Sequence, residues 1–272
     1  MSTTGIQVEE VWARLEPDQD LLNPLTQEKA AELLRRARLG SAPRVLDVGC
    51  GTGGWSRPLL RAHPDADYLG IDVSPTLVDR AREVACDRGL EDRTTFEVAD
   101  ATTYRPPGRF DLIILMGLPA GFGTIEELLN LFRDSLSRGG ALIYGDGIWS
   151  RPPPESALAL TGEEADGQYT FEETVTQVLD AGWLPVFGHQ STEEEWDAFQ
   201  WACVEALARW GLDEGCTHLP PLLNAYAYIG TWLHGYRYNM GFASFLLRPV
   251  PSICRVLGTA NYHAIHDRAK HS

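Results

Sequence analysis

The feature that most constrains the fold is the segment 45–54, Val-Leu-Asp-Val-Gly-Cys-Gly-Thr-Gly-Gly. Its first half is typical of a buried β-strand, and its second half is a glycine-rich turn. Gly49, Gly51 and Gly53 have no Cβ and can adopt a positive φ, so the chain can turn sharply after the strand. A ligand can then lie against the amides of the turn. The segment therefore predicts a site for a nucleoside-bearing cofactor.

Asp47 decides which kind of cofactor this turn suits. Glycines at 49, 51 and 54 also satisfy the G-x-G-x-x-G pattern of dinucleotide-binding proteins. In a dinucleotide site the turn receives a pyrophosphate, which a carboxylate two residues before the first glycine would repel. Asp47 instead favours a ligand that carries a positive charge beside its nucleoside.

Three further strands are predicted at residues 67–74, 95–101 and 110–116. The first of these ends in Asp72, 25 positions after Asp47, where a ribose diol would need an acceptor. The next ends in Asp100, which is suited to the amino group of an adenine. Ligands of open α/β sheets bind at the carboxyl ends of the strands, so these acids are expected at one site.

The chain thus resembles the class I S-adenosylmethionine-dependent methyltransferases over residues 43–146. The matching pieces stand in the family's order at residues 46–53, 70–74, 99–101, 110–113 and 136–143. The resemblance implies a three-layer, doubly wound α/β fold with a seven-stranded, mostly parallel sheet whose last strand is antiparallel. It also implies that S-adenosylmethionine lies across the ends of the first four strands.

The resemblance gives a set of predicted cofactor-binding residues at these strand ends. Two of them have an alternative explanation: Cys50 is expected to be a small structural residue of the turn rather than a nucleophile, and Met116 suits a core position equally well. The predicted residues are Asp47, Gly49, Cys50, Gly51, Gly53, Asp72, Val73, Asp100, Ala101 and Met116.

A single domain is predicted for residues 1–272, with a helical cap at 1–40 and the cofactor-binding core at 43–146. Residues 183–189 and 242–248 are predicted as the sixth and seventh strands. The segment 191–241 between them is too long for a hairpin loop, and it has apolar residues at helical spacing. We expect a helical insertion that lies over the cofactor as a lid for the acceptor site.

The expected reaction is an in-line displacement at the sulfonium methyl by an oxygen, nitrogen or carbon atom of a small molecule, with a specialised metabolite as the leading class. Asp146 and His189 follow or end strands, and each is a candidate general base for an acceptor that must lose a proton. A hydrogen-bonded structural role is the alternative for His189. The candidate acceptor contacts are Trp149, Trp196, His234 and Tyr238. A core role is the alternative for the two tryptophans, and a hydrogen-bonded structural role is the alternative for His234.

Composition restricts the partners and the location. The net charge of −15 argues against nucleic acid, whose recognition depends on Lys and Arg. No apolar run approaches the ~18 residues of a membrane span, and the first ten residues lack a signal peptide's basic and apolar segments. The five cysteines show no metal spacing, and no metal is predicted. We expect a cytoplasmic monomer or homodimer.

Two other functions remain open at this stage. A protein of this fold could catalyse a cyclisation, an elimination or a hydrolysis and use the cofactor only as a scaffold. It could also be a non-catalytic interaction protein, for which an exposed apolar patch rather than a closed pocket would be the sign.

Overall fold

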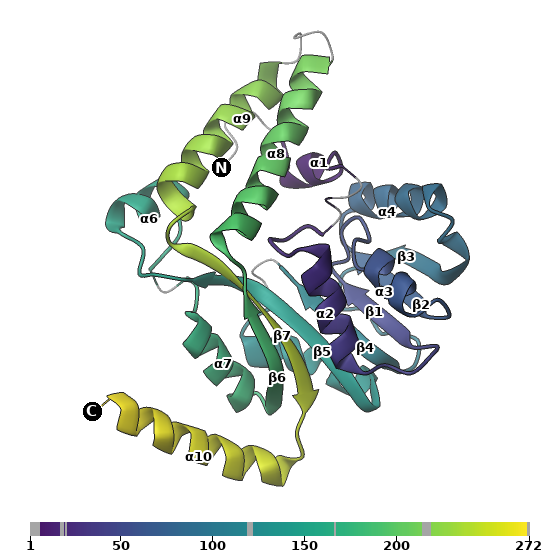
Figure 1. Ribbon diagram of the computed structural model, residues 1–272, viewed down its shortest axis with the longest axis vertical. Coiled ribbons are helices and arrows are strands. Elements are labelled where there is room, and N and C mark those ends of the chain that lie inside the picture. Colours follow the sequence, from purple (N-terminus) through teal and green to yellow (C-terminus); the bar gives the residue numbers. More distant parts are fainter. Residues whose placement is uncertain are drawn as a thin grey trace.

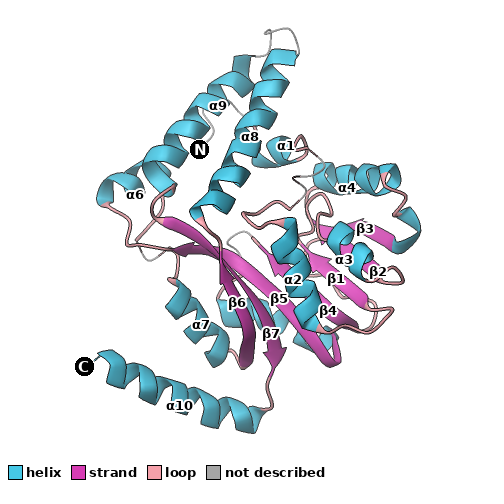
Figure 2. Ribbon diagram, viewed as in Figure 1, coloured by secondary structure: helices cyan, strands magenta, loops and turns pink. Residues whose placement is uncertain are grey.

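The computed structural model describes residues 6–16, 19, 21–118, 122–165, 167–213 and 219–270. Its centre is a seven-stranded sheet in the order β3-β2-β1-β4-β5-β7-β6 (Figures 1 and 2). All neighbouring strands are parallel except β7, which is antiparallel to both β5 and β6. The predicted doubly wound fold is confirmed. The strands are β1 (Arg44–Val48), β2 (Asp67–Asp72), β3 (Thr94–Val98), β4 (Phe110–Met116), β5 (Leu136–Trp149), β6 (Trp183–Gln190) and β7 (Met240–Pro249).

Helices cover both faces of the sheet and give the molecule three layers. On one face α2 (Gln27–Ala37), α3 (Ser56–Ala62) and α4 (Pro75–Asp87) share a buried apolar cluster with alternate residues of the strands. On the other face α5 (Ile125–Leu131) and α7 (Phe171–Asp180) share a second cluster with the remaining strand residues. The central strands are apolar on both sides because both of their faces are buried.

The predicted N-terminal cap divides into two helices with different positions. The second, α2, begins at Thr26, whose hydroxyl accepts a hydrogen bond from the amide of Lys29 at 3.1 Å, and it packs on the sheet. The first, α1 (Val8–Trp12), lies near the carboxyl ends of the strands. Residues 1–5, 17, 18 and 20 of the predicted cap lie outside the described residues.

The segment between β6 and β7 is helical, as its apolar spacing predicted. It contains α8 (Glu193–Asp213), α9 (Leu219–Thr231) and a π-helical turn (Trp232–Tyr236). Figure 1 shows α8 and α9 side by side, projecting beyond the end of the sheet. A third apolar cluster joins this helix pair to α1 through side chains that include Val11, Cys203 and Ala225.

Three shorter helices and a terminal one complete the chain: the 3-10 turns at Glu91–Arg93 and Arg133–Ser135, α6 (Glu155–Thr161) and α10 (Ser252–Lys270). Pro185 lies in β6, which is the last strand in the sheet order and therefore an edge. An edge strand tolerates a residue without an N–H. Among the described residues, no helix combines the length and the apolar character that crossing a bilayer requires.

Candidate functional site

A cavity of about 590 Å³ lies at the carboxyl ends of β1 and β2 and beside the segments that follow β3 and β4. Residues of α1 and of the segment before α2 form its remaining wall. Its lining consists of Val8, Glu9, Trp12, Leu21, Leu22, Asn23, Asp47, Gly49, Cys50, Gly51, Gly54, Trp55, Ile71, Asp72, Val73, Ser74, Leu77, Ala99, Asp100, Ala101, Thr102, Met116, Gly117, Leu118 and Phe122.

The glycine turn has the backbone conformation that the sequence predicted. Gly49, Gly51 and Gly53 have φ angles of 69°, 53° and 77°, a region that side chains with a Cβ rarely adopt. A Cβ on Gly53 would also lie 2.7 Å from the ring of Phe96. The turn therefore has a left-handed conformation that glycine adopts readily, and Gly49 and Gly51 line the cavity.

Asp72 links the turn to the end of β2. One of its carboxylate oxygens accepts a hydrogen bond from the amide of Gly51 and the other accepts one from the amide of Ser74, each at 2.9 Å. The carboxylate is thus fixed in direction, and it keeps lone pairs for a further donor. Asp100 is held in a similar way by the amide and hydroxyl of Thr102, and these bonds lower the pKa of Asp100.

Asp47 is the buried acid of the cavity, with 2% of its surface exposed. Burial raises its pKa to about 7, although the hydroxyl of Tyr68 donates a 2.5 Å hydrogen bond to Oδ2 and partly offsets the rise. Burial also raises the pKa of Cys50, which keeps the thiol protonated. A protonated, buried thiol is a poor nucleophile, so the structural explanation of Cys50 is favoured.

Nine of the ten predicted cofactor-binding residues line the cavity, and Gly53 does not. A glycine is required at residue 53 because the backbone there lies close to the ring of Phe96. The neighbouring Gly54 lines the cavity instead. Sequence reasoning missed the wall formed by Trp12, Asn23 and Trp55. Trp55 directly follows the glycine turn, which was an available signal, whereas no motif distinguishes the other two.

His189 and Asp146 are not brought together, and neither lines the cavity. In the register of the sheet, His189 lies opposite Ser244 of β7. Asp146 lies opposite Ala243, the residue that precedes Ser244. Paired residues of neighbouring strands share a face and successive residues alternate, so the two side chains lie on opposite faces of the sheet. This register argues against both side chains pointing toward one transferred methyl.

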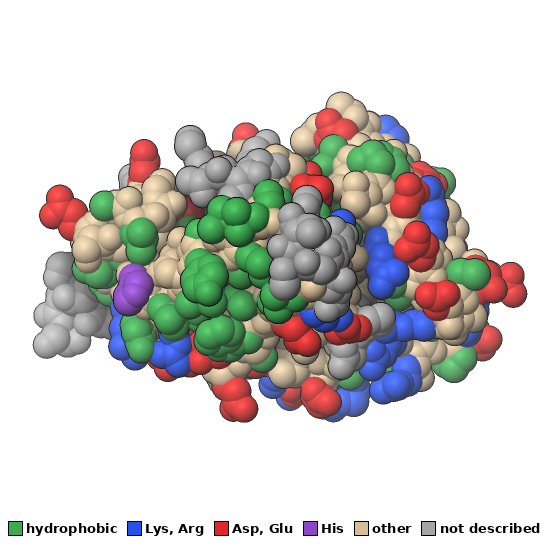
Figure 3. Space-filling model, turned by 90° about the horizontal axis from the view of Figure 1, so that it is seen from above, with side chains coloured by type: hydrophobic (Ala, Val, Ile, Leu, Met, Phe, Trp, Pro, Cys, Tyr) green, Lys and Arg blue, Asp and Glu red, His purple; other side chains and the backbone are tan. Residues whose placement is uncertain are grey.

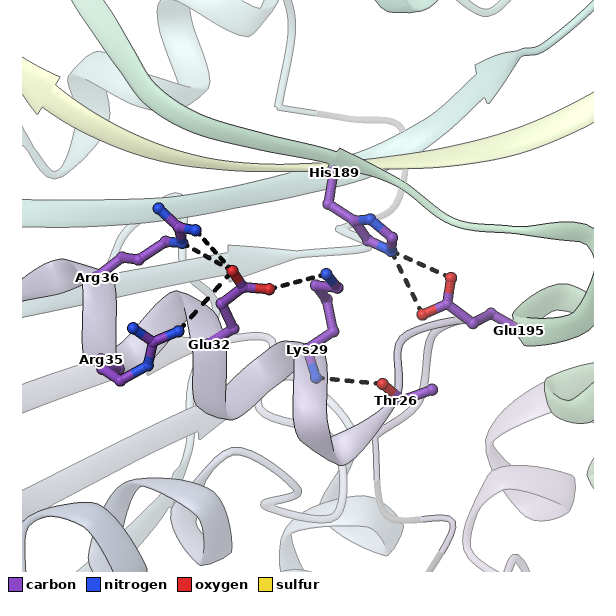
Figure 4. A network of polar contacts seen from close by, with 7 residues as sticks. All are labelled: Thr26, Lys29, Glu32, Arg35, Arg36, His189 and Glu195. Atoms are coloured by element: carbon purple, nitrogen blue, oxygen red, sulfur yellow. Dashed lines mark hydrogen bonds and ion pairs between the residues drawn. The ribbon is translucent and has the colours of Figure 1, made fainter.

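Each of these two side chains has a local partner. The Nε2 atom of His189 lies 3.1 Å from a carboxylate oxygen of Glu195, and the same carboxylate accepts the amide of Thr192 at the start of α8 (Figure 4). His189 therefore ties β6 to the start of α8. Burial raises the pKa of Asp146 to about 6, and its Oδ1 accepts the amide of Gly147.

The four candidate acceptor contacts are dispersed. Trp149 is buried at the end of β5, and His234 is exposed in the π-helical turn. Trp196 is stacked on Trp232 with ring centroids 5.4 Å apart. Only Trp196 and Tyr238 share a wall, that of a smaller cavity of about 250 Å³ beside the ion pair of Arg237 and Asp197.

The chemistry of the main cavity fits a nucleoside with a positive charge. Among its described lining residues there are four carboxylates, Glu9, Asp47, Asp72 and Asp100, and no Lys, Arg or His. Its volume is within the range of small-molecule sites. No group of three or more His, Cys, Asp or Glu suited to a metal occurs in the described part of the chain.

Fold and site together define a doubly wound nucleoside-binding protein, and comparisons with known proteins specify the class. Residues 45–140 match the model of a methyltransferase domain. Over 157 residues the chain is 34% identical to the demethylmenaquinone methyltransferase of Thermus thermophilus, covering 55% of this chain and 69% of that protein. It is 29% identical over 200 residues to the uncharacterized Escherichia coli protein YjhP, and the match covers 72% of this chain and 79% of that protein.

Among solved structures, a Geobacter sulfurreducens S-adenosylmethionine-dependent methyltransferase in complex with S-adenosyl-L-homocysteine matches with a TM-score of 0.79. The match has 24% identity and covers 91% of this chain and all of that one. The chain belongs to the class I S-adenosylmethionine-dependent methyltransferase family. The predicted family and enzyme class are confirmed, and S-adenosylmethionine is the cofactor of that family.

Proposed function

We propose that the protein transfers a methyl group from S-adenosylmethionine to a small-molecule acceptor in the 590 Å³ cavity. The observation that carries the proposal is the convergence of Asp47, Asp72 and Asp100 around a glycine turn whose residues line the same cavity. Asp72, fixed by the amides of Gly51 and Ser74, would accept the ribose hydroxyls. Asp100 would accept the adenine amino group, and Asp47 would face the cationic end.

The bound cofactor supplies an electrophilic sulfonium methyl, and the protein's contribution is alignment in a site from which water is excluded. Trp12 from α1 and Leu22 from the segment before α2 cover the cavity on the side away from the sheet. Helix α1 is backed in turn by α8 through the third apolar cluster. We therefore assign the predicted lid role jointly to α1 and to the α8–α9 pair behind it.

The charge of the cavity restricts the acceptor. Four carboxylates without a cationic side chain among the described lining residues would repel an acceptor that reacts through a carboxylate. Trp12, Leu118 and Phe122 provide apolar contact for its body. We propose an acceptor with an apolar or aromatic part whose reacting oxygen, nitrogen or carbon is in a group that is neutral, or that is cationic in solution and loses its proton before it attacks.

Titration calorimetry with S-adenosyl-L-homocysteine tests the cofactor assignment. Asp72→Ala should weaken binding at least tenfold, because a hydrogen bond to a charged group contributes about 1.5–3 kcal/mol. Asp67→Ala is the matched control, since Asp67 lies at the other end of β2 and pairs with Arg44 outside the cavity. This control should bind within about twofold of the wild type. Equal effects of both substitutions, or a wild type that does not bind, would overturn the proposal.

Turnover of labelled S-adenosylmethionine with a panel of amines, phenols and carboxylic acids then tests the acceptor class. Methylation of amines or phenols but not of carboxylic acids is expected. Bound cofactor without turnover of any acceptor would favour a non-methylating reaction. Figure 3 shows hydrophobic side chains gathered at the end of the molecule where α9 lies, and α9 has Leu219, Leu223 and Tyr226 exposed. Absence of cofactor binding would leave that surface, and an interaction role, as the better explanation.

A further inference from the structure

Helix α9 has an exposed apolar stripe along one side. Leu219, Leu223 and Tyr226 are 58%, 50% and 78% exposed. Their spacing of four and three residues places them on the same side of the helix. Pro221 and Ala225 lie on the opposite side, and both are buried. Large apolar side chains gathered on one face, rather than scattered singly, are typical of a contact with another molecule.

The stripe has no charge on it or beside it. Residues 219–236 contain no Asp, Glu, Lys or Arg, although 22% of the whole chain is charged. The neighbouring α8 carries charged residues from its start at Glu193 to its end at Asp213. Nucleic acid and an anionic membrane both require Lys or Arg, and a basic protein would require carboxylates. The charge pattern therefore favours a partner whose own contact face is uncharged and apolar.

The stripe also has a projection and a gap one helical turn apart. Tyr226 is the projection, and Gly230 follows it at i+4 on the same side of the helix. A Cβ on Gly230 would meet no atom of the described residues within 4 Å, so the gap opens to solvent. A glycine inside a helix costs about 1 kcal/mol relative to alanine. Packing within the described chain does not require that glycine, whereas a second molecule that fills the gap would.

We propose that this stripe is the contact between two copies of the chain. In a two-fold dimer both copies use the same patch, so each contact occurs twice. With the two α9 helices antiparallel across the axis, Tyr226 packs into the gap at Gly230 of the partner subunit. The same register places Leu223 opposite Leu233 of the partner subunit, and Leu233 is also exposed. An uncharged stripe is compatible with this symmetry, because a charge on it would lie close to its own copy.

The shape and charge of the whole molecule are compatible with this contact. Figure 1 shows the α8–α9 pair projecting beyond the end of the sheet. A contact through this pair keeps apart two bodies that each have a net charge of −15. Helix α9 has 13 residues and is about 20 Å long. Its stripe is smaller than the ~800 Å² per partner of a standard interface, so we expect a dissociation constant roughly in the micromolar range.

Sedimentation velocity from about 1 to about 100 μM protein tests the inference, because this range brackets the expected dissociation constant. The wild type should change from monomer to dimer. Tyr226→Ala removes the projection and should weaken the dimer at least tenfold, as expected for a buried aromatic anchor. Gly230→Leu adds apolar surface but fills the gap, and it should weaken the dimer to a similar extent. An apolar patch without complementary shape would instead associate more tightly after Gly230→Leu.

Leu223→Glu and Leu184→Glu form a matched pair. Leu184 is 46% exposed on the edge strand β6, far from α9 in the sequence. Leu223→Glu places a carboxylate in the proposed contact and should abolish the dimer, whereas Leu184→Glu should dimerise like the wild type. Circular dichroism and urea unfolding check that each variant folds. All the substituted side chains are exposed or open to solvent, so the monomer should tolerate the changes.

Four outcomes would overturn the inference. They are a wild type that stays monomeric throughout, a Gly230→Leu variant that dimerises as tightly as the wild type, loss of the dimer in Leu184→Glu, and a monomeric wild type that floats with phosphatidylcholine vesicles. The last result would assign the stripe to a lipid surface. None of these measurements uses the cofactor, so the inference and the proposed function stand or fall separately.

Discussion

The two sides of the sheet differ in how strand ends relate to the site. On the β3-β2-β1-β4 side all strands are parallel, so their carboxyl ends share one edge and Asp47, Asp72 and Asp100 reach one cavity. On the β5-β7-β6 side, β7 is antiparallel to both of its neighbours, so β5 and β6 still run in the same direction, but Asp146 and His189 pair with consecutive residues of β7 and lie on opposite faces. A shared edge of the sheet therefore does not by itself bring two side chains together, because the register must also put them on one face.

The same contrast appears in what satisfies the polar groups. His189 is paired with Glu195, and Asp146 accepts the amide of Gly147, so the two candidate bases on the antiparallel side are engaged within the protein. On the parallel side, Asn23 Oδ1 and Trp55 Nε1 have no partner among the described residues, and Asp47 is buried with a raised pKa. The acids that line the cavity are paired too, as Asp72 and Asp100 show, so what separates the two sides is access to the cavity rather than pairing alone.

The largest expected effect is on the glycine turn of the parallel side. Gly53→Ala introduces a Cβ that meets Phe96, in addition to the unfavourable positive φ. We expect the free energy of unfolding to fall by roughly 3 kcal/mol, as the sum of backbone strain and overpacking. Urea unfolding measures the change.

Gly139→Ala is the control for that experiment. Gly139 has a similar φ of 81°, but a Cβ there would meet nothing within 4 Å. Gly139→Ala should therefore lower the free energy of unfolding by only the backbone part, about 1 kcal/mol. If both substitutions destabilise the protein equally, close packing against Phe96 is not what requires a glycine at residue 53.

The next effect concerns the pH dependence of stability. Because burial raises the pKa of Asp47 to about 7 from the 3.8 of the unfolded chain, the folded state binds more protons between these values. The contribution of Asp47 to the free energy of unfolding is fully present below pH 3.8. It is lost as the pH rises toward 7, by up to about 1.4 kcal/mol per pH unit. Asp47→Asn removes this dependence.

Urea unfolding of the wild type and of Asp47→Asn at pH 5 and pH 7 checks the sign. The variant should gain stability relative to the wild type as the pH rises. Asp146, whose pKa burial raises to about 6, contributes a similar slope to both proteins, so it cancels in the difference. A difference that is independent of pH would show that Asp47 is already ionised at pH 5.

The sequence predicted the fold and the cofactor end of the site because both depend on order along the chain. Alternating strands and helices determine a parallel sheet, and the positions of Asp47 and Asp72 at the ends of β1 and β2, and of Asp100 after β3, follow from that order. By contrast, Asn23 reaches the cavity only because Leu22 packs on Gly51 and Ser191 holds Pro24, contacts across the fold that no local pattern contains. Likewise, the faces of His189 and Asp146 depend on the register of β7, which the spacing of residues does not determine.

The smallest effects should come from the antiparallel side. His189→Gln and Asp146→Asn, alone and together, should change the single-turnover rate of methyl transfer less than fivefold, because neither side chain lines the cavity. His189→Gln should lower the free energy of unfolding by about 1 kcal/mol, the net value of one hydrogen bond, since the contact of His189 with Glu195 only ties β6 to α8. A loss beyond fivefold that appears only in the double variant would mean that the two residues act on the acceptor together. The sheet would then have to rearrange on binding, since its register now holds their side chains on opposite faces.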